Sequence, residues 1–265
     1  MALIPARLGA TRFPRKLLAV LGGRTVIRRT YEAVRDTGLF DAVQVVTDSE
    51  EIRDEILRAG GVAAMSRRPH ESGTDRIAEV AEGLDAGLVL NVQGDEPFTR
   101  REPLERLLDA FVGEAGSGVG VASLMQALED PALIASPNVV KVAVDASWNA
   151  LFFSRSPIPY VRDPAARPAF WEHIGVYAFR REALLAFTRL PPGVLERAEK
   201  IECLRFLEHG IRMRMVPTDY MGVEIDTPED LARAERLLAA RGETRGATAP
   251  GAGARPSGGE EARRA

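Results

Sequence analysis

Short apolar segments alternate with helix-like segments through the first hundred residues, and this order constrains the fold more than any other feature of the sequence. Residues 2–6 (ALIPA), 43–48 (VQVVTD) and 88–96 (LVLNVQGDE) are rich in aliphatic and β-branched residues, as is typical of buried parallel strands. Residues 24–38 and 49–61 lie between them and have the spacing and end signals of helices. This alternation predicts right-handed crossovers, a parallel sheet and an α/β fold.

The middle of the chain contains more strand-like segments. Residues 118–125, 138–145 and 150–159 predict mixed or antiparallel strands. Residues 175–187 predict a strand that runs directly into a helix, and residues 195–210 have the apolar spacing of a single amphipathic helix. The predicted sheet is therefore mostly, but not wholly, parallel.

The C-terminal part combines a well-marked helix start with a polar tail. Thr227 can cap a helix, and Pro228 suits its first position. Residues 241–265 contain no aliphatic side chain larger than alanine. Such a segment cannot bury enough apolar surface to offset the entropy lost on ordering. We expect one domain over residues 1–240 and a disordered tail over residues 241–265.

Composition excludes several classes of protein. The chain has 265 residues and a formal net charge of −3, so it can bury a full core and has no basic excess that would favour nucleic acid. Cys203 is the single cysteine, which excludes an internal disulfide and a cysteine-based zinc site. The three histidines are far apart, and no segment resembles a signal peptide or a membrane span. These observations predict a cytoplasmic protein with no nucleic-acid partner and no membrane insertion.

Four positive side chains follow the first predicted strand: Arg7, Arg12, Arg15 and Lys16. Their loop is expected at the carboxyl edge of a parallel sheet, where α/β folds bind ligands, and its amides and cations can hold a polyphosphate. A solvated basic turn is the simpler alternative. The sequence lacks a P-loop, and residues 116–120 (GSGVG) have the wrong spacing for a dinucleotide-binding loop. These absences argue against a P-loop kinase and a dinucleotide-dependent dehydrogenase.

Two acidic positions complete the set that nucleotide chemistry needs. Asp95 and Glu96 end the third predicted strand, at the same edge of the sheet as the basic loop. Asp226 stands where another strand is expected to end and a helix to begin. Carboxylate oxygens bind Mg²⁺, which binds nucleoside triphosphates. A solvated acidic turn and a helix-capping residue are the alternatives, but the basic loop and the carboxylates together favour metal-assisted nucleotidyl transfer.

Eight motifs occur in order along the chain: IPARLGATRFPRK, HESGTDRIAEV, NVQGDEP, NVVKV, FSRSPIP, HIGVYAFR, LERAEKIECLRFLEHG and IDTPEDL. In register, they resemble the 3-deoxy-manno-octulosonate (Kdo) cytidylyltransferases, also called CMP-Kdo synthetases. The resemblance covers about residues 2–240. It implies a mostly parallel, Rossmann-like nucleotidyltransferase sheet flanked by helices. It also implies a homodimer with a smaller sugar-binding and dimerisation portion, roughly residues 125–215.

The resemblance also implies a reaction, in which CMP passes from CTP to Kdo for lipopolysaccharide biosynthesis, giving CMP-Kdo and pyrophosphate with Mg²⁺ as cofactor. On the matching positions, Arg7, Arg12 and Lys16 would hold the triphosphate. Asp95 and Asp226 would bind Mg²⁺ and complete the catalytic set. The anomeric hydroxyl of Kdo would attack the α-phosphorus while cations neutralise the growing charge.

The remaining substrate contacts follow from the same resemblance. The other nucleotide-binding positions are Ala6, Ser72, Gly73 and Gln93. The Kdo-binding positions are Gln93, Arg155, His173, Tyr177 and Glu202. Arg155 is expected to pair with the Kdo carboxylate, because a guanidinium binds a carboxylate bidentately. Ordinary structural roles are the alternatives. Arg155 could form a surface ion pair, His173 and Tyr177 could be core or interface residues, and Glu202 could be a solvated helix residue.

Four positions depart from the family pattern. Ala10 replaces a common serine, Arg15 a common glycine, Leu17 a common proline, and Cys203 a common glutamine beside the sugar-site glutamate. The last departure leaves 8-amino-Kdo or another acid sugar, such as a sialic acid, as the alternative acceptor. A catalytically silent nucleotide-binding or assembly protein is a second alternative, and the complete set of cations and carboxylates argues against it.

Overall fold

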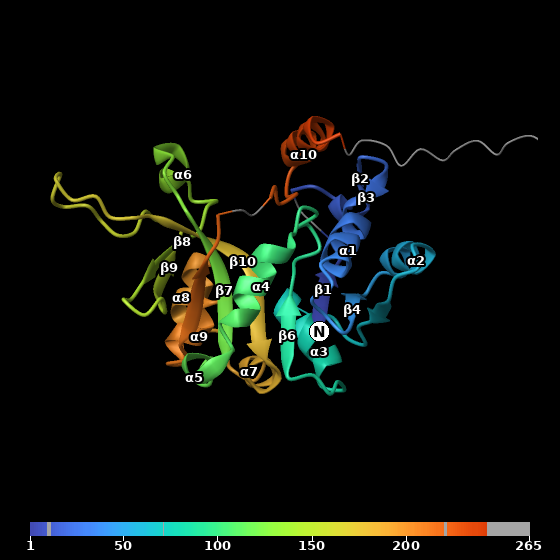
Figure 1. The fold of residues 1–265 in the computed structure, drawn as a ribbon, viewed down its shortest axis with the longest axis horizontal. Helices are drawn as coiled ribbons and strands as arrows, with labels where there is room; N and C mark the ends of the chain where they lie inside the picture. Colours follow the sequence, from blue (N-terminus) through green and yellow to red (C-terminus); the bar gives the residue numbers. More distant parts are fainter. Residues whose placement is uncertain (10–11, 71, 220–221, 243–265) are drawn as a thin grey trace, which may run out of the picture.

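A mixed sheet of nine strands forms the centre of the molecule, with helices on both of its faces (Figure 1). The computed structural model describes residues 1–9, 12–70, 72–219 and 222–242. Along the main path of the sheet, four neighbouring pairs of strands are parallel and two are antiparallel. The predicted α/β class with a mostly parallel sheet is confirmed.

Four parallel strands form one half of the sheet. In spatial order they are β6 (Leu88–Asn91), β1 (Ala2–Ala6), β4 (Val43–Thr47) and β5 (Ala63–Met65). All five residues of β1 are buried, as expected for a central strand covered on both faces. Because these strands are parallel, the loops that follow β1 and β6 emerge at one edge of the sheet.

The other half of the sheet is built around a reversed strand. The long strand β10 (Trp171–Arg180) is antiparallel to β6 on one side and to β7 (Val121–Ala127) on the other. Beyond β7 lies β11 (Met213–Pro217), which is parallel to it. The antiparallel pair β8 (Lys141–Val144) and β9 (Ala150–Ser154) joins β10 near its start. This arrangement confirms the mixed strands predicted for the middle of the chain.

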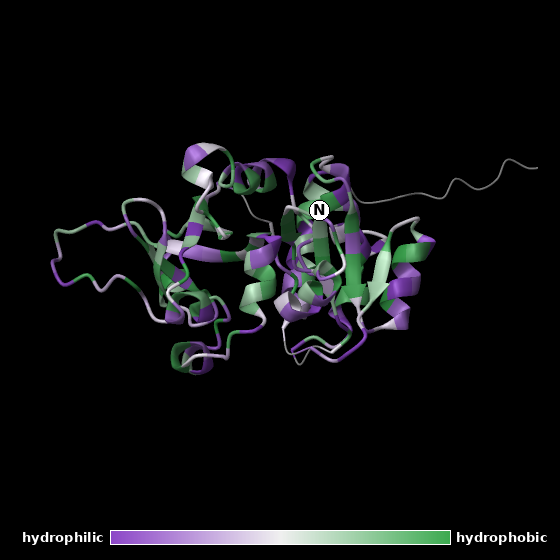
Figure 2. Cartoon of the chain, turned by 90° about the horizontal axis from the view of Figure 1, so that it is seen from below, coloured by the Kyte–Doolittle hydropathy of each residue, from purple (hydrophilic) through white to green (hydrophobic). Residues whose placement is uncertain are grey.

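Neighbouring side chains of the central strand point into two separate cores. Ile4 packs in one cluster with residues of the helices α1, α2, α4 and α10, and Leu3 packs in the other with α3, α7 and α9. Figure 2 shows hydrophobic residues along the central strands and hydrophilic residues on the flanking helices. The helices and short elements are α1 (Val26–Asp36), α2 (Glu50–Arg58), α3 (Gly73–Ala81), α4 (Arg101–Asp109), α5 (Gly113–Gly116), α6 (Pro131–Ala135), α7 (Arg181–Phe187), α8 (Val194–Glu199), α9 (Leu204–Glu208), α10 (Pro228–Ala240), the 3₁₀ helix η1 (Lys16–Leu18), β2 (Val20–Leu21) and β3 (Arg24–Thr25).

The single helix predicted over residues 195–210 is wrong, because the chain forms two short helices there. Lys200 ends α8 in the left-handed region with φ of 55°. The Glu208 carboxylate accepts hydrogen bonds from the backbone of Leu195 at 2.9 Å and Glu196 at 3.0 Å, so the end of α9 caps the start of α8. The break lets the connecting segment reach the core, since Ile201 is only 5% exposed. Tertiary contacts override the helical periodicity.

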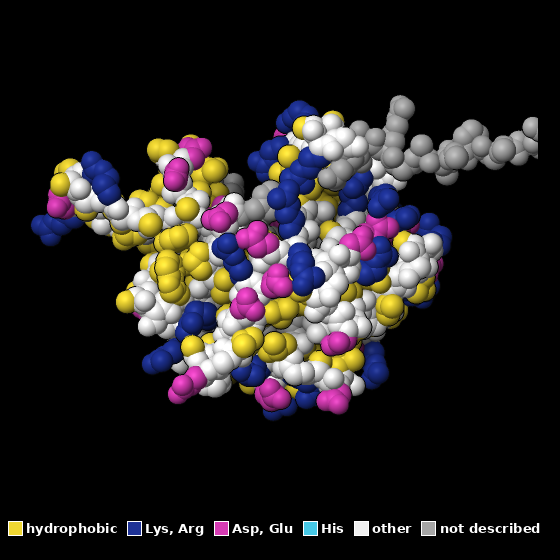
Figure 3. Space-filling view, viewed as in Figure 1, with side chains coloured by type: hydrophobic (Ala, Val, Ile, Leu, Met, Phe, Trp, Pro, Cys, Tyr) yellow, Lys and Arg dark blue, Asp and Glu magenta, His cyan; other side chains and the backbone are white. Residues whose placement is uncertain are grey.

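The strand predicted over residues 150–159 ends at Ser154. The segment 155–170 has no regular structure. It loops out from the body of the molecule before the chain returns in β10 (Figure 1). It carries Tyr160, which is 87% exposed. On the face drawn in Figure 3, Lys and Arg side chains gather around α10 and the β2–β3 hairpin, while both signs of charge mix elsewhere.

Residues 243–265, which make up nearly all of the predicted tail, lie outside the described residues. Within the described part of the chain, no helix is long and apolar enough to cross a membrane. The last described helix, α10, begins as predicted. Thr227 caps it and Pro228 is its first residue.

Candidate active site

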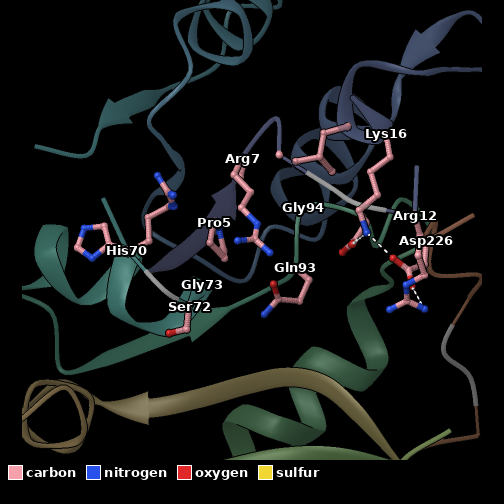
Figure 4. A pocket seen from close by; sticks show the side chains of 15 residues that line it. Pro5, Arg7, Arg12, Lys16, His70, Ser72, Gly73, Gln93, Gly94 and Asp226 are labelled. Carbon is pink, nitrogen blue, oxygen red and sulfur yellow. Dashed lines mark hydrogen bonds and ion pairs between the residues drawn. The ribbon is translucent and has the colours of Figure 1, made fainter. Parts of the chain in front are cut away.

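Three loops at the carboxyl edge of the parallel strands line a cavity of about 280 Å³ (Figure 4). They follow β1, precede α3 and follow β6, and a fourth segment before α10 closes one side. Nine residues predicted for the nucleotide and the metal line this cavity together: Ala6, Arg7, Arg12, Lys16, Ser72, Gly73, Gln93, Asp95 and Asp226. The residues predicted to bind the nucleotide and the metal therefore lie together in the fold, and their binding roles stay predictions.

A cation and two carboxylates occupy the end of the cavity. The Lys16 Nζ atom lies 2.6 Å from Oδ2 of Asp95 and 3.0 Å from Oδ1 of Asp226, although 210 residues separate the lysine from the second aspartate. Arg12 adds an ion pair to Asp226 at 2.6 Å. Burial alone would lower the pKa of Lys16, but the Asp95 and Asp226 carboxylates outweigh it and raise this pKa above its ordinary value.

Close backbone packing explains how Asp95 reaches the cavity. A Cβ atom added at Gly94 would lie 3.0 Å from the carbonyl oxygen of Pro5, so a larger residue would push the loop after β6 away from β1 by a few tenths of an ångström. The Thr30 hydroxyl on α1 donates to the Gly94 carbonyl at 2.9 Å. These contacts fix the turn, and Asp95 follows directly.

The segment before α10 is not the strand predicted to end at Asp226. Residues 222–226 have no strand pairing, and the Ile225 N–H instead donates to the Asp95 carbonyl at 3.0 Å. Asp226 is not the helix cap either, since Thr227 and Asp230 form a capping box at the start of α10. The Asp226 carboxylate is thus left to pair with cations in the cavity.

The N-terminus of α3 forms the opposite wall. Ser72 caps this helix by accepting the Asp75 N–H at 3.0 Å. A Cβ atom at Gly73 would lie 3.1 Å from Pro5 Cγ and 3.4 Å from Gln93 Oε1, so the helix end packs directly on both strand-end loops. The helix amides and the dipole of α3 favour a negatively charged ligand at this end.

A second cavity, of about 630 Å³, adjoins the first and shares Arg12 and Asp226 with it. Its walls include His173 from β10 and the loop that precedes β8. Burial lowers the pKa of His173 to about 4, so the imidazole is neutral near neutral pH. Its Nε2 atom lies 3.0 Å from the Ser123 hydroxyl. We name this second space the acceptor cavity, for the role that the family resemblance predicts. It lies next to the nucleotide cavity.

Comparison with known proteins agrees with this geometry. The family model described as cytidylyltransferase matches residues 1–215. A 3-deoxy-manno-octulosonate cytidylyltransferase of Flavobacterium johnsoniae is 54% identical over 238 residues, which cover 90% of this chain and 98% of the relative. One from Christiangramia forsetii is 52% identical, with 90% of this chain and 96% of the relative covered. The chain belongs to the 3-deoxy-manno-octulosonate cytidylyltransferase family.

A solved structure agrees with this membership. It is described as a CMP:2-keto-3-deoxy-manno-octonic acid synthetase complexed with CTP, and it superposes with a TM-score of 0.85 at 38% identity. The match covers 91% of this chain and 98% of that structure. The family resemblance inferred from the sequence motifs is therefore confirmed, and its fold is shared over nearly all of the described residues.

Two predicted sugar contacts, Tyr177 and Glu202, are half-buried and line neither of the two cavities. Desolvation raises the pKa of Tyr177, and the nearby Cys203 and Glu202 side chains add to this shift. Burial also raises the pKa of Glu202, whose Oε2 atom accepts the Thr74 hydroxyl at 2.9 Å. The Glu202 Oε1 atom is buried and has no hydrogen-bond partner among the described residues, as expected of an acceptor that binds a ligand or a water.

The structure does not bring Arg155 into either cavity. Its guanidinium donates to the backbone carbonyls of Glu199 at 2.7 Å, Pro137 at 2.8 Å and Lys200 at 3.3 Å. These bonds join the end of β9 to α8 and to the loop before β8. The carboxylate-binding role of Arg155 stays a prediction.

Sequence reasoning missed two buried polar residues near the nucleotide cavity. Asn91 is fully buried at the end of β6, where its Oδ1 atom lies 3.5 Å from Gln93 Nε2. Its Nδ2 atom has no hydrogen-bond partner in the part of the chain that the structure describes. Arg76 on α3 lines the cavity and donates to Asp48 at 2.9 Å. An asparagine after three aliphatic residues (LVLN) was a visible signal. Arg76 gave none, because charged residues are common on helices.

Proposed function

We propose that the protein transfers CMP from CTP to Kdo, forming CMP-Kdo and pyrophosphate for lipopolysaccharide biosynthesis, and that it depends on Mg²⁺. The convergence of Asp95 and Asp226 on one cation inside the nucleotide cavity supports the proposal most strongly. The names of the relatives and the CTP complex of the similar structure agree with the substrates.

Mg²⁺ fits the two carboxylates. Asp95 and Asp226 each place one oxygen within 3.0 Å of the same nitrogen, so both can reach a common cation. Magnesium binds one or two protein carboxylates and takes its other ligands from water and phosphate, and two carboxylates suit that pattern. When bound, Mg²⁺ would neutralise negative charge on the triphosphate.

The chain's own cations bind and orient the triphosphate in the proposal. Arg7 and Arg12 extend into the cavity from the loop after β1, and Lys16 reaches it from η1 (Figure 4). Binding a triphosphate would give Lys16 a third anionic partner besides Asp95 and Asp226. The three cations then stabilise the charge that develops as the sugar hydroxyl attacks the α-phosphorus and pyrophosphate leaves in line.

The acceptor cavity would hold the sugar beside the α-phosphate. A neutral His173 can donate or accept a hydrogen bond to a sugar hydroxyl, and Gln93 lies in the nucleotide cavity on the side of β6. The alternative acceptors, 8-amino-Kdo and other acid sugars, are not favoured, because the relatives named above carry the Kdo name.

Assembly and location are further parts of the proposal. We expect a homodimer, and the projecting segment 155–170 with the 87% exposed side chain of Tyr160 is the surface on which we expect a second copy to pack. Light scattering of the full chain and of a Tyr160→Asp variant would test this. The cytoplasmic location stays a prediction.

One assay decides the reaction. Pyrophosphate release is measured with CTP, Mg²⁺ and Kdo, and in parallel with 8-amino-Kdo and a sialic acid. We expect turnover with Kdo that stops when the metal is chelated. Faster turnover with another sugar would favour the alternative acceptor, and CTP binding without turnover on any sugar would favour a silent nucleotide-binding protein.

A further inference from the structure

Lys141 is a fully buried lysine that no substrate contact explains. It lies at the start of β8 and its side chain is 0% exposed. Its Nζ atom donates to the backbone carbonyls of Ser136 at 2.8 Å and Val139 at 2.7 Å, and also to the carbonyl of Arg155. Three carbonyl acceptors surround one nitrogen, so the protonated ammonium group, with three N–H donors, matches the site and a neutral amine does not.

The three carbonyls belong to two different segments of the chain. Ser136 and Val139 lie in the loop before β8, and Arg155 begins the projecting segment after β9. The loop lines the acceptor cavity through Ser136, Asn138 and Val139. The Lys141 ammonium therefore connects a wall of this cavity to the root of the projecting segment.

Two neighbouring bonds extend this connection. The Arg155 guanidinium donates to the Pro137 carbonyl, so Lys141 and Arg155 both hold this loop. The His173 N–H donates to the Val140 carbonyl at 2.8 Å, which ties the end of the loop to β10. A displacement of the loop would thus move the part of the cavity wall next to His173.

We propose that Lys141 is a positioning residue for the acceptor cavity. It touches no substrate, but it fixes the backbone of residues 136–139 and of Arg155, and through them the width of the cavity that receives the acid sugar. The identity of the sugar rests on the proposed function, whereas the link between Lys141 and the loop does not.

The test uses Lys141→Met in the full chain, because methionine keeps most of the length of the side chain and removes the charge and the donors. We expect the KM for Kdo to rise about tenfold or more, with the KM for CTP and kcat changing by less than about threefold. We also expect the backbone amides of Asn138, Val139 and Val140 to exchange hydrogen faster than in the parent protein.

Arg180→Met is a matched control. Arg180 is also a cation that donates to backbone carbonyls, at 3.0 Å to Val119 and 3.0 Å to Gly116, but it lies at the far end of β10 from His173. Its loss should lower stability without changing the KM for Kdo. A rise in that KM in both variants would show a general loss of stability and overturn the proposal.

Lys141→Arg keeps the test decisive if the methionine variant does not fold. A planar guanidinium retains the charge but does not match three carbonyls around one point, so we expect a smaller rise in the KM for Kdo. An unchanged KM for Kdo and unchanged hydrogen exchange in a folded variant would overturn the proposal. Failure of the parent protein to use Kdo would contradict the proposed function alone, since the exchange measurement needs no substrate.

Discussion

The ammonium nitrogen of Lys16 lies 2.6 Å from a carboxylate oxygen of Asp95, and their side chains are each only 14% exposed. The lysine thus stands where two carboxylates converge, and a divalent cation would compete with it for the same oxygens. A bound triphosphate would give the lysine a phosphate partner, and the carboxylates would then be available to the metal. This relationship leads to the first prediction.

Lys16→Met should bind Mn²⁺ more tightly than the parent protein when no nucleotide is present, by about tenfold or more, because one competing positive charge is removed from two carboxylates. Turnover should fall by about two to three orders of magnitude, because a phosphate-binding cation is lost. Electron paramagnetic resonance of free Mn²⁺ and pyrophosphate release measure the two effects. Arg15→Met, which removes the neighbouring exposed cation paired with Glu51, should change neither; weaker Mn²⁺ binding by the Lys16 variant would contradict the prediction.

Asp95→Asn and Asp226→Asn should each reduce Mg²⁺-dependent turnover by at least about a hundredfold with little loss of stability, because asparagine keeps the shape and removes the charge that holds the metal. Turnover over a range of Mg²⁺ concentrations tests this. Asp145→Asn, in the turn between β8 and β9, is the matched control and should retain activity. Full activity and unchanged Mg²⁺ dependence in the Asp226 variant alone would indicate a metal site with a single carboxylate.

His173 should make the folded protein less stable in acid. Its pKa is lowered from 6.5 to about 4 by burial, so between these values the unfolded chain binds a proton that the folded chain does not. The neutral imidazole therefore makes its full contribution to the free energy of unfolding above pH 6.5. This contribution falls as the pH drops toward 4, by at most about 3 kcal/mol. Urea unfolding of His173→Gln should show a smaller decline, whereas the same change at the exposed His209 should not; equal declines would exclude this role.

Arg155→Met separates two roles of this side chain. Loss of its bonds to three carbonyls should lower the free energy of unfolding by about 1–3 kcal/mol. If Arg155 also pairs with the sugar carboxylate, the variant should lose the preference of the parent protein for Kdo over its carboxamide analogue. A preference that survives in the variant would show that another group holds the carboxylate.

Truncation after Gly242 should leave the melting temperature and turnover nearly unchanged, because the removed residues contain no side chain able to join the core. The match to the Flavobacterium johnsoniae relative already reaches 98% of that protein with 90% of this chain. Differential scanning fluorimetry and pyrophosphate release test the prediction. A large loss of either would show that the tail packs on the domain.

The parallel half of the fold was predictable because burial on both faces requires continuous runs of apolar residues, as in β1 and β4. The helix over residues 195–210 was not, because a helical spacing does not distinguish one helix from two that pack together. The deciding contacts are the cap that Glu208 gives to α8 and the left-handed Lys200. Both depend on the folded backbone.

The carboxylate site was predictable for a similar reason. Residues after parallel strands meet at one edge, which brought Asp95 to the basic loop, and the family motifs added Asp226. The partners of Lys141 and Arg155 were not predictable, because they are backbone carbonyls, which every residue carries and which no sequence pattern marks. Asn91 gave a visible signal, but its missing partner is a property of the packed interior.

The reversed strand β10 has a consequence for engineering. It pairs with β6 beside the nucleotide cavity, with β7, and with β8 at Lys141, and it carries His173 in the acceptor cavity. One continuous backbone therefore sets the spacing between the two cavities. A chimaera that exchanges the segments around the acceptor cavity between relatives must keep β10 and its neighbouring strands from one parent. A junction inside this strand would change the spacing between the two cavities.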